Sequence, residues 1–435
     1  MDRDEYPFRH EFGRIVAALT RTFGLHNLAL AEDAAQDTFC RAVEVWKLRG
    51  IPENPAAWLM KAAKNRAIDL LRRERASHDR IAELEAAYRS EWTLVPTVSG
   101  FFDLEAIEDD ELRMLFSCCD PELSEPTQIA LALNLLCGLT AAEIAASLLS
   151  KRAAVEKRIE RGKKSLAASP RLFDFGDREL PERLAAVHRA IYLTFNEGYH
   201  GASPKGAVRF DLCRDAMRLG ALLLQHEFVA TAASYALNAL MALHAARLRA
   251  RVDGAGDLIA LSDQDRARWD RVLIARGIGL LERSATGDAL TEYHIEAAIA
   301  AVHCAAATVD ETDWGRVVWL YDLLVDLRPS PVVALSRAIA VGYRDGPLKG
   351  IEEIRAIAES DRLARYPFYA AALGELEMRA GNARDARRHF EAALALARNA
   401  TERRFLRSKV DGAAVGASGD ALIRRPEEAT TVFRE

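Results

Sequence analysis

The chain has 435 residues, 50% of them hydrophobic and 28% charged, and its formal net charge at pH 7 is −5. This length exceeds what one hydrophobic core normally serves, so two or three domains are expected. The apolar runs are too short to span a bilayer, the start of the chain is charged, and the six cysteines lack zinc-ligand spacing, which together predict a cytoplasmic protein without a structural metal.

Helical spacing of apolar residues runs through nearly the whole sequence, and β-branched alternation is scarce. The predicted fold class is therefore all-α. Breaks in this periodicity divide the chain into a first helical domain, a linker, a second domain, a long helical domain and a flexible tail. Their predicted ranges are, in that order, residues 1–75, 76–110, 111–170, 181–410 and 411–435.

Basic residues are concentrated in two segments, although the net charge is negative. Residues 56–75 hold six basic and two acidic side chains, and residues 151–170 hold seven and two. Residues 101–125 hold nine acidic side chains and one Arg. Attraction to phosphates needs only a local cationic patch, so the two basic segments are candidate nucleic-acid contacts. Solvated helix faces would give the same charge runs, and charge alone leaves both interpretations open.

In the first domain, residues 31–46 have the pattern of an amphipathic helix. Three apolar side chains are expected on one face: Phe39, Val43 and Trp46. Three charged side chains are expected on a second face, which is left for a partner: Asp33, Asp37 and Arg41.

A second helix is predicted over residues 56–75, after a turn at residues 49–55. At 100° per residue its apolar side chains gather on one side: Leu59, Met60, Ala63, Ala67, Leu70 and Leu71. The opposite side is polar except for Ile68: Trp58, Lys61, Lys64, Asn65, Arg72 and Arg75. Cations can hold phosphates, and an aromatic ring or an amide can meet an exposed base, so this side suits an opened duplex. A structural helix with Trp58 in the core is the alternative.

The motif Q-D-T-F-x-R-A, followed by N-P-x-x-W-L and N-x-x-I-D-x-x-R-R, resembles region 2 of extracytoplasmic-function (ECF) sigma factors. The resemblance implies that four residues bind the β′ clamp helices of core RNA polymerase: Asp33, Gln36, Asp37 and Arg41. It also implies that residues 47–55 capture a flipped base of the −10 promoter element. The −10 DNA contacts implied in this way are Arg49, Asn54, Trp58, Lys61, Lys64, Asn65, Arg66 and Arg72.

The second domain contains the pattern of a helix-turn-helix. Thr140 and Glu143 form a capping box, so a helix is expected to start at Thr140, with Ala145 at the close contact between the helices. Ser150 is expected to cap the next helix. That helix has a predicted buried stripe made by Val155, Ile159, Gly162 and Leu166. Its outer side carries cations that suit a major groove: Lys157, Arg161 and Lys164.

The segment L-T-A-A-E-I-A, with A-V-E-K-R-I-E-R-G-K-K-S-L after it, resembles sigma region 4, which reads the −35 element and contacts the polymerase β flap. The −35 contacts implied by this resemblance are Arg152, Ala154, Lys157, Arg158, Arg161 and Lys164. Glu156 stands where a basic residue is usual, and Leu149 stands in the turn where Gly is common. We therefore expect the family's mode of docking on DNA to apply to this chain more readily than its base specificity.

Near the end of the long helical domain, Leu373 and Gly374 followed by Ala386, Phe390 and Ala393 match the tetratricopeptide (TPR) pattern, in which small residues let two helices approach closely. The long domain resembles the C-terminal extension of one ECF subgroup, in which a TPR-like extension takes part in controlling activity. Whether a regulatory protein or a small ligand binds this domain is left open.

The sequence contains no H-E-x-x-H motif, nucleophile elbow or phosphate loop, which predicts that the protein is not an enzyme and needs no cofactor. The polar cluster at residues 263–269 is interpreted as an ion-paired helix start in which Arg266 and Trp269 lock two helical hairpins. The predicted function is an alternative sigma factor that binds core polymerase and promoter DNA. The alternatives are a helix-turn-helix regulator that acts without core polymerase and a ligand-binding or enzymatic protein.

Overall fold

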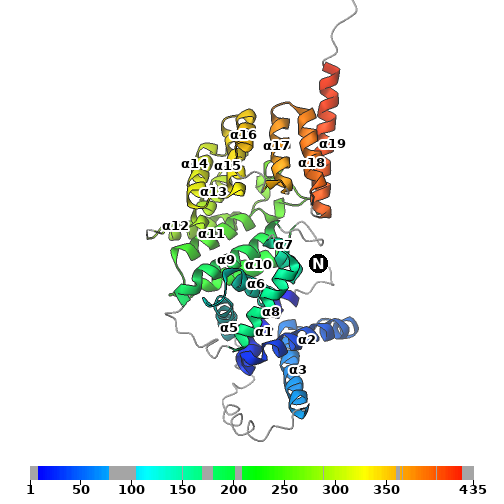
Figure 1. Ribbon diagram of the computed structural model, residues 1–435, viewed down its shortest axis with the longest axis vertical. Helices are drawn as coiled ribbons and strands as arrows, with labels where there is room; N and C mark the ends of the chain where they lie inside the picture. The colour runs from blue at the N-terminus through cyan, green and yellow to red at the C-terminus, as the bar shows by residue number, and fades with distance from the viewer. Residues whose placement is uncertain are drawn as a thin grey trace, which may run out of the picture. The chain divides into compact units, whose positions relative to one another are not determined.

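The computed structural model describes residues 8–77, 104–148, 150–168, 180–200, 208–287, 289–358, 363–364, 366–397 and 399–423. Within these residues the regular elements are α-helices and short 3-10 helices, with one isolated β-bridge between Val252 and Leu258 (Figure 1). The prediction of an all-α fold is confirmed.

The chain forms two compact units. Unit 1 holds residues 1–201 and 209–234, and unit 2 holds residues 202–208 and 235–435. The helices of unit 1 are α1 (Phe8–Phe23), η1 (Leu25–Asn27), α2 (Leu28–Arg49), α3 (Pro55–Ser77), α5 (Leu104–Cys118), α6 (Glu125–Leu135), α7 (Ala141–Ser147), α8 (Arg152–Ala168), α9 (Leu180–His200) and α10 (Phe210–Leu223). Helix α11 (Ala232–Ala245) begins in unit 1 and continues in unit 2.

Helix α6 lies at the centre of unit 1. Eight of its 11 residues are buried, which leaves it without a solvated face. A helix that is buried on all sides must be covered by several neighbours, and α6 packs against both α8 and α9. Unit 1 therefore includes α9 and α10, although the long helical domain was expected to start at residue 181. The domain boundaries themselves stay predictions.

Unit 2 is a series of helices in which each packs against the next, as α13 to α19 in Figure 1 show. Its elements are η4 (Leu248–Ala250), η5 (Leu261–Asp263), η6 (Arg266–Arg268), α12 (Arg271–Ser284), α13 (Glu292–Ala305), α14 (Trp314–Leu327), α15 (Pro331–Arg344), α16 (Pro347–Arg355), α17 (Pro367–Arg379), α18 (Ala383–Ala395) and α19 (Ala400–Ile423).

Small residues set the closest helix contacts of unit 2. A Cβ on Gly374 of α17 would lie 2.7 Å from the Phe390 ring of α18, and a Cβ on Gly350 of α16 would lie 2.6 Å from the Cα of Gly342. Phe390 is also buried against Ala413, and α19 continues to Ile423. Residues 411–423 of the expected flexible tail are therefore helical. The helix pairing fits the TPR pattern, and the repeat assignment itself stays a prediction.

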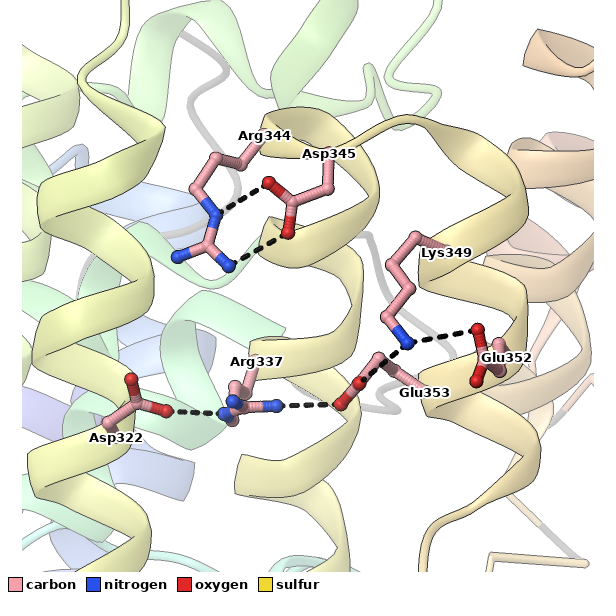
Figure 2. A network of polar contacts seen from close by, with 7 residues as sticks. All are labelled: Asp322, Arg337, Arg344, Asp345, Lys349, Glu352 and Glu353. Atoms are coloured by element: carbon pink, nitrogen blue, oxygen red, sulfur yellow. Dashed lines mark hydrogen bonds and ion pairs between the residues drawn. The ribbon is translucent and has the colours of Figure 1, made fainter.

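Ion pairs connect three successive helices of unit 2 (Figure 2). Arg337 of α15 donates to Asp322 of α14 and, at 2.8 Å, to Glu353 of α16. Lys349 of α16 lies 2.9 Å from Glu352. These side chains are partly exposed, so each pair contributes little stability; only the two Arg337 pairs join different helices.

The polar cluster at residues 263–269 does join helices, as predicted for Arg266 and Trp269. The buried Arg266 guanidinium lies 5.0 Å from the centre of the Trp269 ring. It donates to the carbonyl oxygens of His303 and Ala306, at 2.8 and 2.9 Å, and so satisfies the C-terminal end of α13. The ion pair of the cluster is made by a different residue, Asp263, with Lys409 of α19. Arg266, which was expected to lock the hairpins, is therefore held by hydrogen bonds to carbonyl oxygens and not by the ion pair.

Candidate nucleic-acid and polymerase interface

The buried face of α2 differs in part from the predicted one. It is made by Leu28, Leu30, Ala31, Ala34, Ala35, Thr38, Ala42 and Trp46. Val43 is 42% exposed and Phe39 is only half-buried, so the placement of Val43 on the buried face is wrong. The small residues of α2 let α1 and α3 approach closely, and this stripe rather than the larger side chains determines which face packs.

The four residues assigned to polymerase binding are all exposed on α2: Asp33, Gln36, Asp37 and Arg41. Positions 36, 37 and 41 lie three, four and eight residues after position 33, which places them on one side of the helix. Asp37 also forms an ion pair with Arg66 of α3, at 2.6 Å from the Nη2 atom and 2.7 Å from the Nε atom. One predicted polymerase contact therefore touches one predicted DNA contact.

Helix α3 has the predicted two-sided character. Leu59, Met60, Ala63 and Ala67 are buried, and Leu70 and Leu71 are half-buried. On the opposite side, the exposed residues are Lys61, Asn65 and Arg72, and the half-buried ones are Trp58, Lys64 and Ile68. The side chain of Arg75 lies outside the described residues. The Trp58 ring packs edge-on against Trp46 at 5.5 Å, which holds the indole in place while leaving part of it accessible.

The turn between α2 and α3 is formed by local backbone contacts. Gly50 ends α2 with a φ of 79°, and its N–H donates to the Trp46 carbonyl at 2.9 Å. Asn54 accepts a hydrogen bond from the Ala57 N–H at 3.0 Å and so caps α3, a role that the sequence did not assign to it. Arg49 is exposed, as are two apolar neighbours to which the sequence assigned no individual role, Leu48 and Ile51.

The predicted capping box at the start of α7 is present. The Thr140 N–H donates to Glu143 Oε2 at 2.8 Å, and the Glu143 N–H donates to Thr140 Oγ1 at 3.3 Å. The expected cap at Ser150 is wrong, because α8 begins at Arg152 and the Ser150 hydroxyl instead accepts from Arg158 Nη1 at 3.3 Å. Lys151, and not Ser150, is therefore the residue directly before α8.

The buried stripe of α8 consists of the four predicted residues, Val155, Ile159, Gly162 and Leu166. Of the residues assigned to −35 DNA, the exposed ones are Arg152, Lys157, Arg161 and Lys164, and the half-buried ones are Ala154 and Arg158. Arg152 pairs with Glu156 and Lys164 pairs with Glu160, each at 2.8 Å and four residues along the helix. In the described part of the chain, Lys157 and Arg161 make no ion pair, so their charges are available to phosphates.

Helix α8 also contacts the segment that carries α2, which the sequence did not predict. Lys163 Nζ lies 2.6 Å from Glu32 Oε1, next to Asp33 in the set of α2 residues that the sequence assigned to polymerase binding. Burial raises the pKa of the Glu32 carboxyl, and Lys163 opposes this effect. Gly13 of α1 lies so close to the Leu136 carbonyl oxygen, just after α6, that there is no room for a Cβ. The two basic helices therefore belong to one packed unit.

Among the described residues, no group of three or more His, Cys, Asp and Glu side chains is placed to hold a metal ion. The same residues include no helix that combines the length and hydropathy needed to span a membrane.

Comparisons with family models match two segments of the chain. Residues 8–77, which cover α1 to α3, match the family model for sigma-70 region 2, and residues 183–285 match a family of unknown function, DUF6596. The uncharacterized protein R00370 of Rhizobium meliloti (strain 1021) is 39% identical over 397 residues, 91% of this chain and 92% of the relative.

A second relative is the ECF RNA polymerase sigma factor SigK of Mycobacterium ulcerans (strain Agy99). It is 26% identical over 164 residues, which cover 36% of this chain and 81% of SigK. No solved structure matches the chain significantly.

Proposed function

We propose that the chain is an alternative sigma factor of the ECF type. It belongs to the same family as the Rhizobium meliloti protein R00370, and it carries a sigma-70 region 2 domain. In this proposal it binds core RNA polymerase and directs initiation at specific promoters. The observation that carries the proposal is the cationic side of α3, which is solvent-accessible beside a half-buried Trp58 inside the matched segment.

Helix α2 supplies the proposed polymerase contact. Its four exposed residues, Asp33, Gln36, Asp37 and Arg41, present three charges and an amide next to each other, which suits a polar partner surface. Their proposed partner is the pair of clamp helices of the β′ subunit. The ion pair with Arg66 keeps the Asp37 carboxylate on the α3 side of this face.

Helix α3 and the turn before it supply the proposed −10 contact. Lys61 and Arg72 reach phosphates from the exposed side, Asn65 can hydrogen-bond a base edge, and the accessible part of the Trp58 indole can stack on an unpaired base. Trp46 supports the indole from behind, so little side-chain order is lost when a base stacks there. The proposed role of this helix is to stabilise melted promoter DNA.

Helices α7 and α8 supply the proposed −35 contact as a helix-turn-helix. The Thr140–Glu143 capping box and the buried stripe of α8 orient α8 so that Lys157 and Arg161 face outward. Two unpaired cations on the outer side of a helix suit a major groove and its phosphates. The polymerase β flap is the proposed protein partner of this domain.

The helices of unit 2 supply a proposed TPR-like regulatory scaffold. The close contacts at Gly350 and Gly374 support a stack of paired helices, and such stacks present extended surfaces to partners. In the proposal this unit controls the activity of unit 1. The chemistry of its partner is left to experiment.

The proposal is tested by in vitro transcription of fragmented genomic DNA, with the new 5′ ends sequenced. Core polymerase together with the full chain is expected to give new transcripts that share two upstream elements, and neither component alone is expected to give them. Specific DNA retardation without core polymerase, together with no new transcripts when core is present, would instead identify a helix-turn-helix regulator.

A further inference from the structure

We infer that α9 and α10 act as a brace for the proposed DNA-reading helices and that Arg209 is the residue through which the brace positions α7. The term brace is used for α9, α10 and Arg209 together. This inference rests on the proposed function of α7 and α8. It assigns a role to the first part of the segment that matches the family of unknown function, residues 183–285.

A single carboxylate connects the brace to the capping box. Glu143 Oε2 accepts from the N–H and the hydroxyl of Thr140, both at 2.8 Å, and Glu143 Oε1 accepts from Arg209 Nη1 at 2.8 Å. The side chains of Arg209 and Glu143 are only 10% and 22% exposed. Removing one partner from a charge-assisted contact with so little solvent access costs more than breaking a surface pair, and the geometry of the contact fixes the direction of both groups. The start of α7 is therefore tied to the start of α10.

The second nitrogen of the same guanidinium is also fixed. Arg209 Nη2 donates to Asp211 Oδ2 at 2.8 Å, so the side chain is held from both ends of its planar group. A guanidinium with two carboxylate partners has few alternative rotamers. Its contact with Glu143 is therefore directional.

The backbone of Arg209 is held by a close joint between α9 and α10. The Arg209 N–H donates to the Gly198 carbonyl at 2.8 Å. A Cβ on Gly198 would lie 2.8 Å from the Cys213 nitrogen and 2.9 Å from the Arg209 carbonyl oxygen, so only glycine allows this approach. Because main-chain atoms form the joint, the brace presents Arg209 from a fixed place.

The brace is anchored on α5, which packs against α6 and α8. Arg218 of α10 makes two hydrogen bonds, at 2.6 and 2.8 Å, to Glu111 of α5, which is fully buried. Arg183 of α9 donates to the Phe116 carbonyl at 3.2 Å, and its Nη2 lies 3.1 Å from Asp120. These contacts are spread along α5 and the turn after it. They leave the brace little freedom to move relative to the helix-turn-helix.

The test compares Arg209→Gln with Arg214→Gln in the full chain. Arg214 is exposed on α10, so it is a matched control that leaves Glu143 untouched. The first readout is hydrogen exchange: Arg209→Gln is expected to speed exchange of the α7 amides by about tenfold, the effect of losing one charged hydrogen bond, with α5 and α9 unchanged. Unchanged exchange in α7, or equally faster exchange in α5 and α9, would overturn the positioning role.

The second readout is binding of the core complex to a promoter found by the transcription experiment, with and without its −35 element. Arg209→Gln is expected to lose about tenfold affinity only when the −35 element is present. Equal losses on both DNAs would contradict the inference. Arg209→Lys keeps the positive charge but on a single nitrogen, so it should recover part of the loss. If the wild-type chain shows no −35 dependence, the proposed function fails, while hydrogen exchange still decides the role of the brace.

A second variant tests the same contact from the Glu143 side, so that the inference does not depend on whether Arg209→Gln folds. Glu143→Gln keeps an oxygen that can accept from Thr140 but removes the charge that attracts Arg209. It should speed exchange in α7 in the same direction and by a smaller factor. Exchange at the wild-type rate in this variant would count against Arg209 as the positioning residue.

Discussion

At the scale of single residues, the ion pair between Asp37 and Arg66 joins two side chains that the sequence assigned to different partners. The Asp37 side chain is 49% exposed and the Arg66 side chain 32% exposed, so the pair itself adds little stability. Its importance is that any change at Asp37 also changes the surroundings of Arg66. Variants at this site therefore need a partner variant as control.

Asp37→Arg is expected to weaken core binding by roughly a hundredfold, because it reverses a charge in a proposed polar interface. The double variant Asp37→Arg with Arg66→Asp restores an ion pair between α2 and α3 but leaves the proposed polymerase face reversed. It should therefore bind core as weakly as the single variant. The measurement is the affinity of labelled chain for core polymerase; wild-type affinity in either variant would remove Asp37 from the interface.

The buried His188 is expected to make unit 1 sensitive to acid. It is buried on α9, its Nε2 atom lies 2.8 Å from Ser234 Oγ, and burial lowers the pKa of its ring to about 4. Below about pH 6.5, the ordinary pKa of His, the His188 ring is protonated in the unfolded chain but stays largely neutral in the folded chain. The stability that the neutral ring contributes is therefore complete above pH 6.5 and is lost as the pH falls toward 4.

His188→Gln should remove this part of the acid sensitivity, because the amide can bond Ser234 without titrating. The free energy of unfolding of the wild type is expected to fall by up to about 3 kcal/mol more than that of the variant between pH 7 and pH 4. Urea unfolding at both pH values measures the difference. Parallel pH profiles for the two proteins would show that His188 is not the responsible group.

At the scale of helices, local patterns predicted what lies within one element. The Thr140–Glu143 capping box and the stripe of Val155 and Ile159 on α8 depend on spacing along a single helix, and the structure has them as predicted. Val43 was misplaced because the side of α2 that packs is decided by its neighbours, α1 and α3. Spacing within α2 carries no information about those helices.

The same limit applies to contacts between distant helices. The sequence did not predict that Lys163 meets Glu32 or that Arg209 meets Glu143, because these partners lie 131 and 66 residues apart. The unbroken apolar run at residues 129–133 of α6 was the one available signal that a further helix must cover it. Which helix does so, α9, requires the tertiary structure.

Helix packing at Gly198 gives a direct test of the α9–α10 joint. Gly198→Ala is expected to lower the free energy of unfolding of unit 1 by about 1–3 kcal/mol, because the new methyl group meets main-chain atoms of Arg209 and Cys213. The control is Gly279→Ala on α12, where nothing lies within 4 Å of the added Cβ and helix propensity should give a small gain. Similar unfolding curves for Gly198→Ala and the wild type would contradict the close joint.

At the scale of the whole molecule, the proposed promoter-reading half extends beyond the helix-turn-helix. The sequence separates residues 111–170 from the long helical domain, yet α9 and α10 pack with α5 and α6 in unit 1. The TPR pattern around Gly374 and Phe390 was visible in the sequence because both residues belong to adjacent helices. The sequence did not show that α9 and α10 belong to unit 1, since this depends on long-range ion pairs such as that of Arg218 with Glu111.

Truncation after Pro170 should therefore unfold part of unit 1 rather than simply release it from control. The cut removes α9 from α6 and leaves the buried Glu111 carboxylate without Arg218. The fragment is expected to bind a hydrophobic dye and to lose cooperative urea unfolding. The control is full-length Arg266→Gln, which disturbs α13 in unit 2 and should leave the unfolding of unit 1 intact. A truncated chain that unfolds as cooperatively as the control would contradict this.

The most direct test of the sigma-factor account is where α3 and α8 lie on one promoter. An iron chelate can be attached at Asp69→Cys of α3 or Glu160→Cys of α8, with the exposed Cys40 replaced by serine; both acidic positions are exposed and are not proposed DNA contacts. With core polymerase, hydroxyl-radical cleavage is predicted near −10 from residue 69 and near −35 from residue 160, about 80 Å apart along the duplex. Because Lys163 of α8 contacts Glu32 of α2 in the free chain, this result requires that contact to open when the chain binds core polymerase. Cleavage of a single short stretch from both sites, or cleavage from residue 160 that needs no core polymerase and none from residue 69, would contradict the account.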